Sequence, residues 1–146
     1  MRLTFIDADE RDPRYVGELD LRYRVLRVPL GMGRETVRFP FEDDSLHLVA
    51  QDDVDDAVIG CVLFYPDNDG GGRLFQMAVD DTLQRGGVGR ALVTRLEAHL
   101  ADIGVARVHL HARDSAIGFY QRLGYVMYGE PFGEVGVEHR HMAKSL

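Results

Sequence analysis

Residues 77–100, MAVDDTLQRGGVGRALVTRLEAHL, predict the end of a strand, a tight glycine loop and a long amphipathic helix. Three loop positions, Gly86, Gly87 and Gly89, allow sharp turns and a close approach of the backbone to a ligand, because glycine has no Cβ. The first N–H groups of the helix point back into this loop, and the positive end of the helix dipole favours an anion there. The loop therefore predicts a pyrophosphate site.

Arg85 and Arg90 flank this loop, and their guanidinium groups can pair with phosphate oxygens. The dinucleotide fingerprint G-x-G-x-x-G would need a third glycine where the chain has Leu92. The Walker pattern needs Gly-Lys-Ser/Thr at the start of the helix, where the chain has Gly89-Arg90-Ala91. Both patterns fail, so a nucleotide-binding βαβ protein is not predicted.

Two segments resemble motifs of the GNAT superfamily of N-acetyltransferases. The loop pattern Gln84-x-x-Gly87-x-Gly89 resembles the signature Q/R-x-x-G-x-G/A of that superfamily. Residues 112–125, ARDSAIGFYQRLGY, resemble its segment A-x-x-x-A-x-x-F-Y-x-x-x-G-F/Y, and the strand-like VHLHA precedes them. Two motifs in the right order are more specific than either one. The resemblance covers most of the chain from about Leu46 onward.

The resemblance implies an acetyl-CoA-dependent N-acyltransferase that moves an acetyl group to a primary amine of a small molecule or peptide by direct attack in a ternary complex. A non-catalytic acyl-CoA-binding sensor or interaction module on the same fold is the alternative. In the superfamily the strand before the loop pairs with pantetheine and the loop binds the pyrophosphate. The residues that would bind acetyl-CoA or CoA are Met77, Ala78, Val79, Gln84, Arg85, Gly86, Gly87, Val88, Gly89, Arg90, Ser115, Phe119 and Tyr120.

Tyr120 is the candidate that protonates the departing thiolate, since it matches the motif tyrosine with this role in many GNAT enzymes. A phenol with an ordinary pKa of about 10 suits a thiolate with a pKa of about 8.5 to 10. The alternative is that Tyr120 packs beside Phe119 and only touches the cofactor. Arg113 stands where many relatives carry asparagine.

The sequence offers several candidates for the general base, because the position of the glutamate that some histone-type relatives carry is Arg73 here. Residues 136–142, GVEHRHM, resemble the ending G-I/V-x-H-x-x-M of one group of small bacterial GNAT proteins, which favours His139 as the second catalytic residue. The alternatives are an ordered water, or a His139 that only packs at the sheet end. The other candidate bases are His141, Glu134, Glu138 and Glu42.

Composition and charge limit the partners. A chain of 146 residues with 45% hydrophobic residues and a net charge of −7 predicts one domain, and the negative charge argues against nucleic acid. The acidic runs 42–44, 52–53 and 55–56 either attract a cationic substrate or lie in solvated loops. No apolar run is long enough to span a bilayer and the N-terminal residues turn acidic early, so we expect no membrane partner and a cytoplasmic protein. The resemblance also allows a homodimer.

Cysteine and histidine positions predict neither a disulfide nor a metal site. Cys61 is the single cysteine and lies in an apolar run, which favours inert packing. His109-x-His111 and His139-x-His141 each place two imidazoles on one strand face, which could chelate a metal. No carboxylate or cysteine stands at a useful spacing to complete either site, so we expect no metal.

The first half of the chain predicts an edge strand, a helix and a meander. Asp12-Pro13 indicates a helix start that Pro29 ends, with Val16, Leu19, Tyr23 and Leu26 on its buried face. Residues 30–41 predict an irregular loop or a short second helix, in the region that walls the acceptor site in GNAT proteins. The expected strands are residues 2–7, 46–51, 58–65 and 74–79, the last three in an antiparallel meander.

The second half predicts a right-handed crossover and two further strands. The long helix should bury Val88, Leu92, Leu96, Leu100 and Ile103 and stop at Gly104. Strand 105–111 should then lie parallel to strand 74–79, followed by a helix that Asp114 caps and that runs to Leu123. Strands 125–128 and 136–144 complete the expected fold. It is an α/β (α+β) fold, GNAT-like, with a mixed, mostly antiparallel sheet of six to seven strands and about four helices, in a single domain over residues 1–146.

Overall fold

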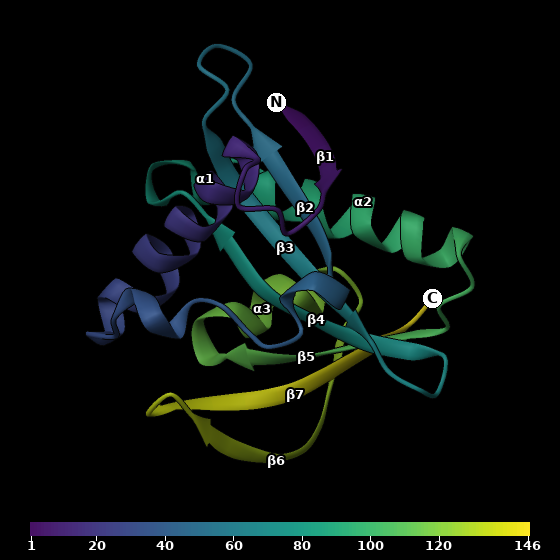
Figure 1. Ribbon diagram of the computed structural model, residues 1–146. Coiled ribbons are helices and arrows are strands. Elements are labelled where there is room, and N and C mark those ends of the chain that lie inside the picture. Colours follow the sequence, from purple (N-terminus) through teal and green to yellow (C-terminus); the bar gives the residue numbers. More distant parts are fainter.

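The computed structural model describes all residues 1–146 and shows one seven-stranded mixed sheet in the order β1-β2-β3-β4-β5-β7-β6 (Figure 1). The strands are β1 (Arg2–Ile6), β2 (Leu46–Gln51), β3 (Val58–Pro66), β4 (Gly71–Val79), β5 (Arg107–Arg113), β6 (Val126–Glu134) and β7 (Val137–Ser145). The helices are α1 (Pro13–Arg22), α2 (Val88–Asp102) and α3 (Asp114–Arg122), three against the four or so expected. The predicted fold class is confirmed.

The sheet has two antiparallel parts that meet at one parallel pair. Strands β1 to β4 form an antiparallel meander, as predicted, and β5, β7 and β6 pair antiparallel in that order. The parallel pair is β4 and β5, which α2 connects. The crossover predicted from the helix between two strands is therefore present.

Two strands, β4 and β6, extend beyond their predicted bounds of 74–79 and 125–128. Strand β4 begins at Gly71, and a Cβ at Gly71 would lie 2.8 Å from the carbonyl oxygen of Arg107, while one at Gly72 would overlap the ring of Phe64. Only glycine permits this approach of three strands. Strand β6 runs to Glu134 rather than ending at Tyr128, because an irregular register after Tyr128 accommodates the proline within it.

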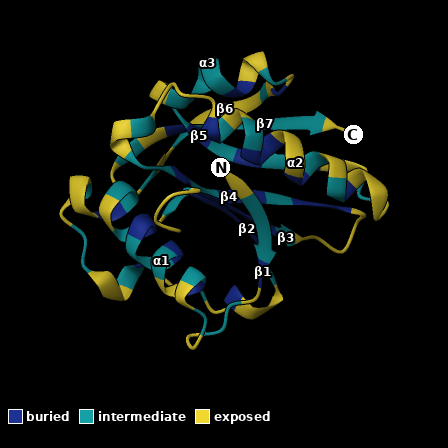
Figure 2. Cartoon of the chain, turned by 90° about the horizontal axis from the view of Figure 1, so that it is seen from above, coloured by how far each residue is buried: buried dark blue, intermediate teal, exposed yellow.

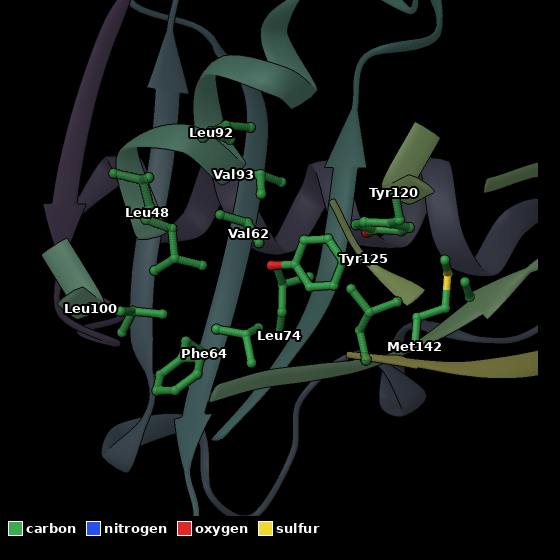
Figure 3. Close-up of a cluster of buried hydrophobic side chains, with 14 of the residues drawn as sticks. Leu48, Val62, Phe64, Leu74, Leu92, Val93, Leu100, Tyr120, Tyr125 and Met142 are labelled. Atoms are coloured by element: carbon green, nitrogen blue, oxygen red, sulfur yellow. The ribbon is translucent and has the colours of Figure 1, made fainter. Parts of the chain in front are cut away.

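Helices cover both faces of the sheet (Figure 2). The larger core lies between the sheet and helices α2 and α3, and Figure 3 shows Leu48, Val62, Phe64 and Leu74 of the strands facing Leu92, Val93 and Leu100 of α2. The smaller core lies under α1 on the opposite face. Its buried members are Ile6, Tyr15, Leu21, Val49, Cys61 and Ala78. Cys61 is thus a packing residue, and burial raises the pKa of its thiol.

The start of α1 is confirmed, but its predicted buried face is only partly correct, since Leu19 and Leu26 pack against the smaller core and Val16 does not. The Asp12 side chain accepts a hydrogen bond of 2.9 Å from the backbone N–H of Arg14, which caps the helix. Val16, predicted to be buried, is 52% exposed, whereas Glu18 and Arg22 are completely buried. The apolar pattern misses the most buried positions of α1, because these include charged residues that find partners elsewhere in the chain.

These partners form a buried polar network beneath α1. Arg22 Nη1 donates to Glu18 Oε2 over 2.8 Å and also to Glu42, while its Nη2 donates to the carbonyl oxygen of Val37 over 2.6 Å. His47 on β2 contacts Glu18 from the other side. Glu42, expected in a solvated acidic loop, is therefore buried and joins residues 30–44 to α1.

Helix boundaries differ from prediction at two further positions. Ile103 is 58% exposed, because α2 ends at Asp102 and Gly104 follows with a φ of +87°. The other four positions of the predicted stripe are buried. Asp114 is the first residue of α3 rather than its cap, since β5 continues as far as Arg113, which takes the N-cap position in an extended conformation.

Candidate active site

Strands β4 and β5 separate soon after they meet. They pair only at Gly71–Arg73 and Arg107–His109, so the rest of β4 has no strand partner on the side facing β5. Gln76 adopts a φ of +51° where the register between β3 and β4 shifts, which is a bulge that bends β4. In Figure 1 β4 rises away from β5 beyond their contact.

A cleft of about 1240 Å³ occupies the space between the two strands. Its walls come from β4, the glycine loop, the ends of β5 and β6, helix α3, β7 and the turn that follows α1. The predicted cofactor residues Gly86 and Val88 do not line this cleft. Those that do are Met77, Ala78, Val79, Gln84, Arg85, Gly87, Gly89, Arg90, Ser115, Phe119 and Tyr120.

The glycine loop presents backbone amides at one end of the cleft. Gly87 has a φ of +89° and is the N-cap of α2, and the N–H groups of Gly87, Val88, Gly89 and Arg90 donate no hydrogen bond within the chain. The side chain of Val88 is buried, so this residue offers only its amide. Such a row of free N–H groups at a helix N-terminus favours an anion.

Two residues of the loop segment, Gly86 and Gln84, make hydrogen bonds that fix the shape of the loop. The amide of Gly86 donates to the carbonyl oxygen of Leu83 over 3.1 Å, which closes the turn. The side-chain amide of Gln84 donates to the carbonyl oxygen of Val79 over 3.2 Å and to Asp81 over 3.1 Å. Gln84 therefore ties the loop to the end of β4.

Tyr120 lies on α3 and faces the cleft with its ring packed against Phe119 and Tyr125, at centroid distances of 5.0 and 5.6 Å. Its hydroxyl group makes no side-chain hydrogen bond within the chain, whereas the buried Tyr125 donates to Glu97 over 2.8 Å. Burial raises the pKa of Tyr120 above that of a free phenol. The hydroxyl is therefore protonated at neutral pH and available to a ligand.

His139 on β7 and Glu134 at the end of β6 lie together in the cleft wall. Nδ1 of His139 is 2.8 Å from the carbonyl oxygen of Val137, and because a carbonyl can only accept, this nitrogen carries the proton. Nε2 then faces Glu134, 3.6 Å from its Oε2. An ammonium group that lies beside this pair of atoms would find an acceptor in each of them.

Glu134 is ionised and has further partners on β4 and β5. The Nδ1 of His111 lies 3.0 Å from Glu134 Oε1 and the Arg73 guanidinium 3.6 Å from the same atom. The hydrogen bond from His111 holds the pKa of Glu134 below its ordinary value, although burial alone would raise it. A carboxylate with a lowered pKa is a weak base, so His139 is better suited to accept a proton from an amine.

The other candidate bases lie away from the cleft. Glu42 belongs to the buried network under α1, and Glu138 is exposed. His141 stacks on Phe132 at a centroid distance of 4.2 Å and does not line the cleft.

The histidine pairs considered as metal chelators have separate partners. His109 contacts Asp67 over 2.7 Å, whereas His111 contacts Glu134. A different group, Glu18, Glu42 and His47, has ligand atoms within 4.8 Å of one another. The guanidinium of Arg22 bonds to both of these carboxylates and supplies the positive charge there.

Arg27 is a cleft residue that the sequence analysis missed. It lies in a π-helical turn, Tyr23–Arg27, that extends α1, and it is only 7% exposed. Phe39, from the irregular segment 30–41, lines the same part of the cleft. The sequence gives no sign that this arginine is buried, because arginine in an amphipathic helix is ordinarily exposed. The structure marks the region as unusual, since the α-helix ends at Arg22, several residues before Pro29.

The model of the Acetyltransferase (GNAT) family matches residues 9–125 of the chain. The chain belongs to the GNAT acetyltransferase family. This GNAT protein is 31% identical over 74 residues to the uncharacterized protein YyaT of Bacillus subtilis (strain 168), which covers 51% of the chain and 50% of YyaT. The match thus spans about half the length of that relative.

Two solved structures share the fold of this GNAT protein. Escherichia coli ElaA has a TM-score of 0.83 at 19% identity, with 99% of each chain covered. An aminoglycoside 6'-N-acetyltransferase complexed with coenzyme A has a TM-score of 0.78 at 20% identity, with 99% of this chain and 97% of that chain covered. No helix of the GNAT protein combines the length and apolar character needed to cross a membrane.

Proposed function

We propose that this GNAT protein transfers the acetyl group of acetyl-CoA to a primary amine of a small molecule or peptide, by direct attack in a ternary complex. The observation that carries this proposal is a single cleft with free backbone amides at the glycine loop and with Tyr120, His139 and Glu134 in its walls. Anion binding, proton donation and proton acceptance are thereby combined in one site.

The cleft suits a pyrophosphate joined to a pantetheine chain. The amides of residues 87–90 would bind the pyrophosphate, and Arg85 and Arg90 stand beside them in the cleft wall. Met77, Ala78 and Val79 lie on the part of β4 that lacks a strand partner toward β5, so their backbone could bond to the pantetheine amides. A GNAT neighbour of the same fold was solved with coenzyme A, which supports this assignment.

When bound, acetyl-CoA would supply the acetyl thioester. The acceptor ammonium would contact both His139 Nε2 and the Glu134 carboxylate and would lose one proton to His139. The neutral amine nitrogen then forms a bond to the carbonyl carbon, the carbon–sulfur bond breaks, and the sulfur takes its proton from the Tyr120 hydroxyl. The nitrogen loses its second proton as the amide forms, and this proton restores the Tyr120 hydroxyl, while the proton on His139 passes to solvent. The ionised Glu134 would stabilise the imidazolium that forms.

Acetyl-CoA titration and a turnover screen test this proposal together. We expect calorimetry to show acetyl-CoA binding, and a panel of amines, peptides and aminoglycosides to include acceptors that release CoA thiol and gain the mass of an acetyl group. The only protein thiol, on Cys61, is buried and contributes little to a thiol assay. A sensor protein would bind acetyl-CoA without amine-dependent thiol release, and absence of binding would overturn both functions.

A further inference from the structure

The part of the cleft that surrounds His139 and Glu134 has an excess of positive charge. Arg27, Arg73 and Arg113 line it from three different segments of the chain, and Glu134 is the only carboxylate beside them. The second carboxylate of the cleft, Asp81, lies by the glycine loop and accepts from Gln84. If the histidines are neutral, this part of the cleft holds three positively charged guanidinium groups and one negatively charged carboxylate.

Arg27 has no acidic partner although it is buried. Its guanidinium contacts only the carbonyl oxygens of Thr36 and Leu26, at 3.4 to 3.5 Å, which are long for hydrogen bonds. Burial and the neighbouring cations Arg22 and Arg113 lower the pKa of Arg27, and the charge of Glu134 offsets this only in part. A buried arginine ordinarily pairs with an anion, so an anionic partner is missing here.

Arg22, one helical turn earlier, shows what a purely structural buried arginine looks like in this protein. It pairs with Glu18 and Glu42 and also donates to the carbonyl oxygen of Val37. Arg27 also contacts carbonyl oxygens, but it has no carboxylate partner and it lines the cleft. Its position is therefore better explained by a ligand than by folding.

Arg73 on β4 also has unused hydrogen-bond donors in the cleft, although its Nη2 lies 3.6 Å from Glu134. Burial lowers the pKa of its guanidinium, and its Nε has no hydrogen-bond partner. Its Nη2 lies 3.1 Å from Nδ1 of His111, the nitrogen that donates to Glu134. The guanidinium thus retains donors that the protein does not use.

We propose that the amine acceptor carries an oxyanion, such as a carboxylate, that Arg27 binds together with Arg113 and Arg73, while its amino group faces Glu134 and His139. This inference rests on the proposed function and adds the substrate class. The acceptor is then an amino acid or a similar zwitterion, and not a polyamine as the net charge of −7 would suggest. The local charge of the cleft outweighs the net charge, because low-dielectric walls focus the field of the nearest groups.

Matched pairs of acceptors test the inference directly. The twenty L-amino acids are compared with their carboxamides, β-alanine with β-alaninamide, and phosphoethanolamine with ethanolamine. We expect kcat/KM for the preferred acid to exceed that for its amide at least about tenfold. The amide lacks the negative charge, and the loss of a charged hydrogen-bond partner has an effect of this size. The phosphoethanolamine arm distinguishes a phosphate from a carboxylate as the oxyanion.

Variants of two neighbouring arginines assign the effect to Arg27. Arg27→Gln should raise KM for the acid about tenfold or more with a smaller change in kcat, and should leave KM for the amide nearly unchanged. Arg27→Lys should restore part of the acid preference, because the charge remains. Arg24→Gln is the matched control, since Arg24 lies in the same turn but is exposed and pairs with Asp20.

The outcomes separate this inference from the proposed function. Faster turnover of amides or diamines than of acids would overturn the anionic acceptor and leave acetyl transfer intact. If no amine is acetylated, calorimetry of the CoA-loaded protein with N-acetyl amino acids and their amides gives the answer, since only the acids should bind and Arg27→Gln should abolish that binding. Equal binding of acids and amides, or no binding of the acids, would overturn the inference.

Discussion

Nδ1 of His47 lies 2.9 Å from a carboxylate oxygen of Glu18, and both side chains are completely buried. The Nε2 of the same ring lies 2.8 Å from the carbonyl oxygen of Glu42. Because both ring nitrogens face groups that can only accept, the imidazole is doubly protonated. The ion pair joins β2 to α1 and completes the charge balance of the network around Arg22.

The stability of the protein should therefore depend on pH near neutrality. Burial alone would lower the pKa of His47, but the hydrogen bond and charge of Glu18 outweigh burial and raise it. A raised pKa in the folded state stabilises fully below the unfolded value of about 6.5, and this stabilisation is lost as the pH rises through the folded value. We expect the free energy of unfolding to fall by up to about 1.4 kcal/mol per pH unit in that window.

Urea unfolding between about pH 6 and pH 9 measures this slope. His47→Gln should flatten the profile, and His99→Gln is the control, because His99 is half-buried on α2 against Phe5 and lies outside the network. A flat profile in the unmodified protein, or a slope that survives in His47→Gln, would contradict a charged His47.

Gly87→Glu should abolish acetyl-CoA binding without unfolding the protein. The substitution places a carboxylate at the free amides of the loop, and its Cβ meets no atom within 4 Å. Gly70→Glu is the matched control, because Gly70 has a nearly identical φ of +87° and equal space but lies in the turn before β4. Calorimetry and circular dichroism on both variants separate backbone strain from lost binding. Equal affinity in the two folded variants would rule out the pyrophosphate site.

Tyr120→Phe should lower kcat by at least about tenfold while acetyl-CoA affinity stays nearly constant, because the ring and its packing survive and only the acid is lost. Tyr125→Phe provides the contrast, since it removes the hydrogen bond to Glu97 and should cost about 1 kcal/mol of stability with little effect on kcat. Steady-state kinetics and thermal unfolding of both variants decide between them. Full turnover of Tyr120→Phe, with chemistry rate-limiting, would make Tyr120 a packing residue.

His139→Ala should lower kcat/KM by about 100-fold or more, and added imidazole should restore part of the rate. Glu134→Gln should have a smaller effect that falls mainly on the KM of the amine. Since the pKa of Glu134 lies below its ordinary value, its ionisation should not limit the rate between about pH 5 and pH 8. Glu138→Gln is the control, because Glu138 is exposed beside His139. An unaffected His139→Ala enzyme would point to water as the base.

The sequence predicts those parts of this fold that depend on local patterns. The loop at Gly87, the buried stripe of α2 and the meander of β2 to β4 follow from glycine positions and from periods of 3.6 and 2 residues. Glu18 and Arg22 could not be predicted as buried, because their partners Glu42 and His47 lie 20 and 29 residues away. A prediction that places every charged residue on the surface therefore misses a buried network whose members are so far apart in the sequence.

The residues of the candidate site likewise fall into those that the sequence predicts and those that only the structure reveals. The motif residues near Gly87 and Tyr120 could be placed in the cleft from sequence, since each motif is contiguous. Arg27 and Arg73 could not, because their burial depends on how α1 and β6 approach β4 in three dimensions. The narrowing of the base candidates to His139 and Glu134 likewise required the structure, which removes Glu42 and His141 from the cleft.

The brief contact of β4 with β5 also has a mechanical consequence. Three residue pairs form the only backbone ladder between β1–β4 and β5–β7, and each of these groups is continuous in sequence. In the proposed complex the pantetheine chain would take the place of a missing strand in the gap between them. A bound cofactor would then connect the two halves of the sheet through its hydrogen bonds. The protein would therefore be more rigid with acetyl-CoA bound than without it.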